Sequence, residues 1–211
     1  MIAEPQLLEL ETHLPANLAN EILDVLKNKN VQLTITKKRS TKLGDYRRPN
    51  SKVKYHRISV NGSLNKYSFL ITLVHELAHL EVFENFKSNI LPHGIEWKNT
   101  FGQMLGNLLV RNIFPDDISK ELANYAQNPK ASSVSDVNLM IALKKYDEGN
   151  QPILNDLPGQ AVFQIGKKIF QKGQKRRTRF LCKELTTNKM YVVSGLAEIK
   201  LLDSINNISV I

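Results

Sequence analysis

A chain of 211 residues, of which 42% are hydrophobic, can bury one sizeable core and a small second module, so a fibrous or disordered protein is excluded. No stretch approaches the roughly 18 consecutive apolar residues of a membrane span, and the N-terminus has no signal-like pattern, so we expect a cytoplasmic protein without a membrane partner. The single cysteine, Cys182, excludes an internal disulfide and any metal site built from several cysteines. A formal net charge of +9 favours attraction to polyanions such as nucleic acid.

The first part of the chain combines helical and strand patterns. Apolar side chains at helical spacing predict a first helix over residues 15 to 28. Short alternating segments then predict a small, mainly antiparallel sheet, with strands over residues 31–36, 43–48 and 54–60. Helical patterns return and predict three more helices, over residues 67–86, 95–110 and about 116–128. In the second of these, Trp97, Phe101 and Leu105 form a stripe that we expect to face the core.

Beyond residue 128 the pattern changes twice. Residues 129–158 have a linker-like composition and contain a short helix over residues 136–145. Residues 159–211 then alternate with a period of two and predict a small all-β module. Its expected strands cover residues 161–165, 168–171, 176–182 and 189–193, with turns at residues 166, 172–173 and 187–188. The predicted fold class is therefore α+β, with the first domain over residues 1–128.

The residues with the clearest chemistry lie in the long helix, as His75-Glu76-Leu77-Ala78-His79. Residues four apart project from one face of a helix, so the two imidazoles can bind one metal ion. Glu76 can then reach a water on that ion and serve as a general base without being a ligand. His93 lies in a Pro-His-Gly turn, which allows the chain to fold back as a third ligand. Three protein ligands leave zinc a fourth position for water, which is typical of a catalytic site, so we expect one zinc ion per chain.

Two features of this site stay open at the level of sequence. Glu96 competes with His93 as third ligand, whereas Glu81 and Glu84 follow His79 too closely on the same helix to bend around one ion. A group that stabilises an oxyanion is also expected, and the sequence does not choose among four candidates. These are Tyr46, His56, Arg57 and Tyr67.

The motif His75-Glu-Leu-Ala-His79, followed by His93-Gly-Ile-Glu-Trp97, resembles the SprT-like zinc metallopeptidase family, relatives of the DNA–protein crosslink protease Spartan. Leu43–Tyr46 and His56–Asn61 resemble the short strands of that family, and the likeness covers about residues 15 to 130. The resemblance implies a zincin-like domain that hydrolyses peptide bonds with a zinc-activated water, and it suggests DNA-associated proteins as substrates. Members often end in a zinc ribbon with four cysteines. Here the β-module resembles such a ribbon without its cysteines, so we expect no second zinc.

The β-module contains the densest basic cluster of the chain. If they lie on one strand, Lys175, Arg177 and Arg179 share a face and can follow a phosphate backbone, which predicts weak binding to DNA or RNA without sequence preference. The alternative is a solvated hairpin without a partner. Two other functions also stay open: a nucleic-acid-binding scaffold with a structural zinc, and a metallohydrolase that acts on a non-peptide amide.

Overall fold

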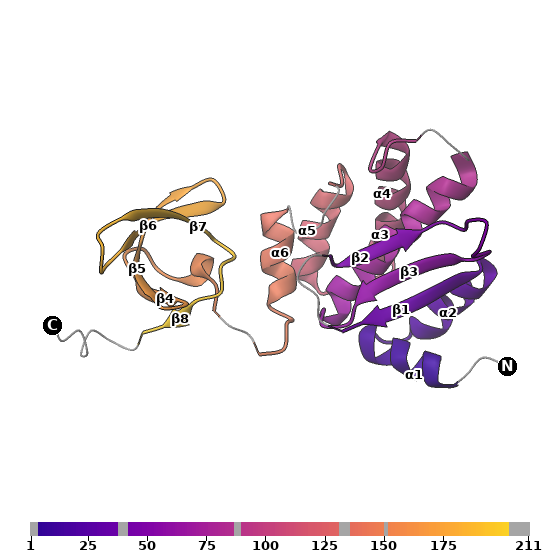
Figure 1. Cartoon of the computed structure of the whole chain (residues 1–211), viewed down its shortest axis with the longest axis horizontal. Helices are drawn as coiled ribbons and strands as arrows, with labels where there is room; N and C mark the ends of the chain where they lie inside the picture. Colours follow the sequence, from indigo (N-terminus) through magenta and orange to yellow (C-terminus); the bar gives the residue numbers. More distant parts are fainter. Residues whose placement is uncertain (1–3, 38–41, 87–89, 131–135, 150–151, 203–211) are drawn as a thin grey trace. The chain divides into compact units, whose positions relative to one another are not determined.

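The computed structural model describes residues 4–37, 42–86, 90–130, 136–149 and 152–202 (Figure 1). The chain divides into two compact units, Met1–Glu148 and Gly149–Ile211. The fold is mixed α+β, with helices and one sheet in the first unit and a second sheet in the C-terminal unit. Among the described helices, none is both long and apolar enough to cross a membrane.

The sheet of the first unit has three strands in the order β1-β3-β2. They are β1 (Val31–Thr36), β2 (Gly44–Arg47) and β3 (His56–Asn61). β2 pairs antiparallel with β3, but β1 pairs parallel with β3, so the prediction of a mainly antiparallel sheet is wrong for β1. The reason is that β3 inserts between β1 and β2. β1 and β2 run in opposite directions, so β3, which is antiparallel to β2, is parallel to β1.

In the part of the first unit that the structure describes, six α-helices accompany this sheet. They are α1 (Glu4–His13), α2 (Ala19–Asn28), α3 (Lys66–Phe86), α4 (Ile95–Val110), α5 (Asp116–Ala126) and α6 (Val137–Lys144). α4 has the predicted bounds, and α3 starts one residue before them. α2 begins four residues later than predicted, and α1 was not predicted. The apolar pattern of α1 is weak: Leu10 is buried in the core, whereas Leu8 is 60% exposed.

α3 is the central helix of the first unit. Its side chains are buried on most sides, because β2 and β3 pack against one side and α4 against another. Asn65 caps the helix: its Oδ1 accepts hydrogen bonds from the backbone N–H groups of Tyr67 (3.1 Å) and Ser68 (2.9 Å). Each fully buried leucine of such a helix stabilises the fold by about 1.5–3 kcal/mol. α3 is therefore a rigid platform for the side chains that it carries.

α6 is the short helix that was expected inside the linker. It packs on α5, and its Leu139, Ala142 and Leu143 are buried in the core that α3 and α4 also form. Asp136 caps it, with Oδ1 accepting a hydrogen bond from the backbone N–H of Leu139 (3.1 Å). The first compact unit accordingly extends to Glu148.

The C-terminal unit is a five-stranded antiparallel sheet in the order β7-β6-β5-β4-β8. Its strands are β4 (Val162–Ile165), β5 (Lys168–Arg176), β6 (Arg179–Glu184), β7 (Met190–Ser194) and β8 (Lys200–Leu201). A separate small core lies against the sheet. It consists of Leu154, Phe163, Phe170, Phe180, Cys182 and Ile199. The prediction of a small C-terminal β-module is confirmed.

The turn expected at Lys172-Gly173 is wrong, because β5 continues through both residues to Arg176. The pairing register of β5 with β6 shifts between Lys172 and Lys175, and a Cβ on Gly173 would collide with the carbonyl oxygen of Leu181. This glycine therefore reflects a bulge with close backbone approach rather than a turn.

The turn of the β5–β6 hairpin lies further along the chain, between the paired residues Arg176 and Arg179. Arg177 occupies it in the left-handed region, with φ of 52°. Lys175 is therefore on β5, Arg177 in the turn and Arg179 on β6. The prediction that these three side chains share one face of one strand is wrong. They are still close in the structure, because all three surround the tip of one hairpin.

Candidate metal centre

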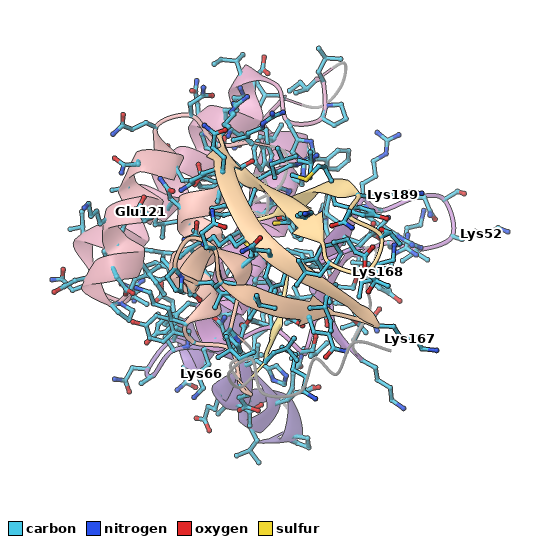
Figure 2. The ribbon with its side chains drawn as sticks, turned by 90° about the vertical axis from the view of Figure 1, so that its left-hand side faces the viewer. Lys52, Lys66, Glu121, Lys167, Lys168 and Lys189 are labelled. Carbon is cyan, nitrogen blue, oxygen red and sulfur yellow. The ribbon has the colours of Figure 1, made fainter. Side chains whose placement is uncertain are left out.

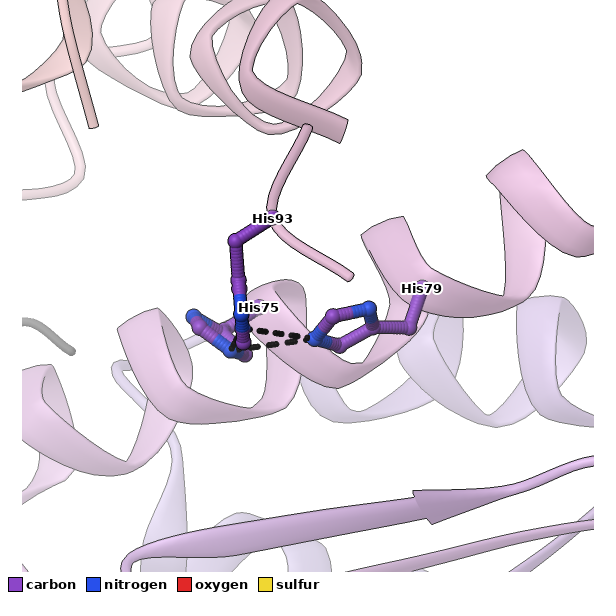
Figure 3. Close-up of side chains that lie close together, drawn as sticks. All are labelled: His75, His79 and His93. Carbon is purple, nitrogen blue, oxygen red and sulfur yellow. Dashed lines mark hydrogen bonds between the residues drawn. The ribbon is translucent and has the colours of Figure 1, made fainter. Parts of the chain in front are cut away.

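Three histidine side chains from two segments of the first unit meet at one point. His75 and His79 project from the same face of α3, one turn apart, and His93 approaches from the segment before α4 (Figure 3). Their Nε2 atoms form a nearly equilateral triangle: 3.3 Å between His75 and His79, 3.1 Å between His79 and His93, and 3.3 Å between His93 and His75.

The triangle has the dimensions of a tetrahedral zinc site. Zinc–nitrogen bonds of about 2.0–2.1 Å at tetrahedral angles place two ligand nitrogens about 3.3 Å apart. Burial lowers the pKa of His75 to about 3 and that of His79 to about 4, and it also lowers the pKa of His93. The three rings are therefore neutral near pH 7, which is the form that binds a metal.

A tight turn directs His93 toward α3. The backbone N–H of Gly94 donates to the carbonyl of Leu91 (2.9 Å), so Pro92 and His93 are the two central residues of a β-turn. His93 has φ of 60°, in the left-handed region. A turn with proline first and a left-handed residue second normally has glycine or asparagine at the second position. Histidine there costs about 1–2 kcal/mol, and such strain is typical of functional positions.

Trp97 backs the whole cluster. Its ring centroid lies 4.6 Å from that of His75, 5.3 Å from that of His79 and 4.7 Å from that of His93. Trp97, Phe101 and Leu105 are all buried, as predicted for the inward stripe of α4. The sequence did not indicate that Trp97, a member of this stripe, also packs against all three imidazole rings. Trp97 therefore restricts the ring orientations at the cluster and excludes water from one side.

The alternative third ligands lie elsewhere. Lys29 binds both Glu81 and Glu84 of α3, with its Nζ 2.8 Å from a carboxylate oxygen of each. Among the described residues, the only group whose ligand atoms converge within reach of one ion is His75, His79 and His93, without Glu96. Of the two candidates that the sequence left open, His93 is the one whose side chain converges on His75 and His79.

Glu76 is buried and lies under the edge strand of the sheet. It is 6% exposed, and a Cβ on Gly44 would lie 2.9 Å from both its Cγ and its Cδ. The backbone of β2 thus packs directly on the Glu76 side chain, and only glycine leaves room for it. Sequence reasoning missed this contact. The available signal was an isolated glycine at a strand, which often marks a close approach of backbone to another group.

Tyr46 lies on β2, two residues after Gly44, and borders the histidine cluster. Its ring is nearly parallel to that of His79, with centroids 6.4 Å apart. Its hydroxyl lies 2.9 Å from Nδ1 of His56, and burial raises the pKa of the Tyr46 phenol, so it stays protonated at neutral pH. Tyr67, another candidate oxyanion group, instead packs against Phe114 and Tyr146.

The model of the SprT-like family matches residues 12–113, which contain the sheet, α3, His93 and all of α4. Over these residues, just under half of the chain, the protein is similar to the SprT-like family. No match was found among curated proteins or among solved structures.

A cavity of about 250 Å³ adjoins the histidine cluster of this SprT-like region. Two of the three histidines, His79 and His93, form part of its wall. The other lining residues are mainly apolar or aromatic. They are Tyr46, Arg48, Val82, Phe83, Ile90, Leu91, Pro92 and Trp97. A concave, mostly apolar space beside convergent polar groups is typical of a ligand site.

The predicted nucleic-acid-binding residues lie outside the SprT-like region, in the C-terminal unit. Lys175, Arg177 and Arg179 are all exposed at the tip of the β5–β6 hairpin. Further lysines extend from the same unit, among them Lys167 and Lys189 (Figure 2). No phosphate-binding geometry follows from exposure alone, so their role stays a prediction.

Proposed function

We propose that this SprT-like protein is a zinc-dependent metallopeptidase with a zincin-like catalytic domain. The observation that supports this most directly is the triangle of Nε2 atoms from His75, His79 and His93, whose 3.1–3.3 Å sides suit tetrahedral zinc. The family match agrees with a zinc-dependent hydrolase. When bound, zinc would polarise the substrate carbonyl and lower the pKa of a water molecule.

In this proposal Glu76 moves the proton. Its carboxylate accepts a proton from the attacking water as the bond between water oxygen and carbonyl carbon forms. The proton then goes to the amide nitrogen as the peptide C–N bond breaks, so Glu76 is regenerated. Positioned acid–base groups contribute about 10²- to 10⁴-fold to rate. The close packing of Gly44 over the Glu76 side chain limits the positions that the carboxylate can take.

The substrate in this proposal is an extended protein segment. β2 lies at one edge of its sheet, and it contributes both Gly44 over Glu76 and Tyr46 beside His79. A peptide added along this edge would pair with the β2 backbone and pass the histidine cluster. We further propose, from the family alone, that DNA-associated proteins are among the substrates.

Replacement of Glu76 with glutamine tests the function. The wild-type chain should carry one zinc per molecule and cut an unfolded test protein, while Glu76→Gln should keep the zinc and lose at least about 100-fold in rate, because an amide cannot accept the proton. Zinc is measured by elemental analysis and cleavage by mass spectrometry of the products. A Glu76→Gln variant that cuts at the wild-type rate would favour a structural zinc in a scaffold. Failure of the wild type to cut any protein would favour a non-peptide amide as substrate.

We also propose a polyanion-binding role for the C-terminal unit, because charge is concentrated there. Gly149–Ile211 contains ten lysines or arginines and four acidic residues, so it carries +6 of the net charge of +9 in less than a third of the chain. Weak, salt-dependent binding to DNA or RNA is the expected consequence.

A further inference from the structure

We propose that the cavity beside the histidine cluster is a specificity pocket, which accepts a bulky apolar side chain of the peptide next to the bond that is cut and rejects a basic one. This inference rests on the proposed peptidase function, and it adds the chemical class of substrate. It follows from the position of the cavity, from the residues that form its walls and from the positive charge of Arg48.

The position of the cavity connects it to the chemistry. His79 and His93 contribute both to the cavity wall and to the Nε2 triangle. A peptide whose scissile carbonyl lies at the triangle must therefore place the side chain of an adjacent residue at or in the cavity. Tyr46 of the edge strand β2 also lines it, so the cavity lies along the path proposed for the peptide backbone.

The walls are held in place by packing outside the cavity. The ring of Phe83 contacts the edge of His56, with centroids 5.9 Å apart and planes at 73°. The hydroxyl of Tyr46 lies 2.9 Å from Nδ1 of the same His56. Trp97, another lining residue, is only 1% exposed. Tyr46 and Phe83 therefore share one buried support, His56, and the pocket needs little rearrangement before it binds a ligand.

The size and lining of the cavity favour an apolar occupant. A volume of about 250 Å³ is sufficient for a phenyl or isobutyl group. Val82, Phe83, Leu91 and Trp97 offer such a group aliphatic and aromatic contact. Each methylene in a hydrophobic pocket changes specificity by about 10-fold or more, so phenylalanine or leucine should be preferred to alanine by at least about 10-fold.

Arg48 supplies the discrimination against basic side chains. It lines the cavity with a permanent positive charge, and its guanidinium carbon lies 5.8 Å from the centroid of the Phe83 ring. Arg48 is exposed, so water screens part of its charge, but a lysine side chain in the pocket would still meet a positive charge and find no acidic partner among the lining residues. A neutral glutamine at position 48 removes the repulsion but leaves the apolar walls.

Binding can be measured without catalysis, because Trp97 is the only tryptophan of the chain and lines the cavity. Zinc-loaded full-length protein is titrated with N-acetyl-phenylalanine amide, N-acetyl-alanine amide and N-acetyl-lysine amide, and tryptophan emission is recorded. The phenylalanine compound should change the emission saturably and bind at least about 10-fold more tightly than the other two. No saturable change with the phenylalanine compound would overturn the proposal.

Two phenylalanines of α3 provide a matched pair of variants. Phe83→Ala removes a wall of the cavity and should weaken binding of the phenylalanine compound about 10-fold. Phe86→Ala makes the same truncation three residues later, at a side chain that is 50% exposed and does not line the cavity, and should leave binding unchanged. Equal effects of the two variants would overturn the assignment of the pocket.

Cleavage of a peptide series separates this proposal from the proposed function. The peptides differ only at the two positions that flank the bond that is cut, where phenylalanine, leucine, alanine or lysine is placed. A preference for phenylalanine and leucine at one of these positions supports the pocket, and Arg48→Gln should raise cleavage of the lysine peptide to the level of the alanine peptide. Cleavage without preference overturns the pocket and leaves the peptidase function intact. Cleavage of no peptide overturns the peptidase function, while tryptophan emission still tests the pocket.

Discussion

Replacing Gly44 with alanine is the most specific test of how the edge strand positions Glu76. The new Cβ would lie 2.9 Å from both Cγ and Cδ of Glu76, whereas carbon atoms in contact normally stay about 3.5–4.0 Å apart. The Glu76 side chain would therefore move by about 1 Å. Misplacement of a catalytic group by this distance can cost about 100-fold in rate, so we expect kcat/KM to fall about 100-fold.

The assay compares three proteins on one peptide: wild type, Gly44→Ala and Gly106→Ala. Gly106 is the control, because a Cβ there meets nothing within 4 Å and alanine stabilises a helix interior by about 0.5–1 kcal/mol. Zinc content is measured for each protein and should remain at one ion per chain. If Gly44 acts only through Glu76, adding Gly44→Ala to Glu76→Gln should cause little further loss. A Gly44→Ala protein with wild-type kcat/KM would refute the reasoning, and a parallel loss of zinc would assign the effect to the metal site instead.

Three further predictions concern the third ligand, the strained turn and the basic hairpin. His93→Ala should strongly reduce zinc content while Glu96→Ala should not, because only the histidine nitrogen lies in the triangle; elemental analysis with the opposite result would contradict this assignment. In the metal-free protein, His93→Gly should raise the free energy of unfolding by about 1 kcal/mol, since glycine accepts φ of 60° without strain, and equal urea midpoints of the variant and wild type would contradict it. Changing Lys175, Arg177 and Arg179 to glutamate should weaken oligonucleotide binding about equally for all sequences and flatten its dependence on salt, as measured by fluorescence anisotropy at two salt concentrations; salt-dependent binding that is unchanged in the variant would place the contact elsewhere.

The sequence determined the features that depend on neighbours along the chain. The apolar spacing of α3 and α4 predicted both helices almost to the residue, because helical periodicity is a local property. The spacing of His75 and His79 predicted that both would lie on one face of α3. The alternation beyond residue 159 predicted the β-module, although its glycine at position 173 was misread as a turn.

Only the tertiary structure decided how distant segments meet. The insertion of β3 between β1 and β2, the approach of His93 to His75 and His79, and the contact of Gly44 with Glu76 all join residues separated by loops. No periodicity carries this information, because a loop can lead a strand to either edge of a sheet and a turn can aim a side chain in many directions. These contacts are selected by the shared core, which must bury the apolar surfaces of the sheet, α3 and α4 together. The candidate metal centre thus combines a helix motif that is visible in sequence with a turn, an edge strand and a tryptophan that packing brings to it.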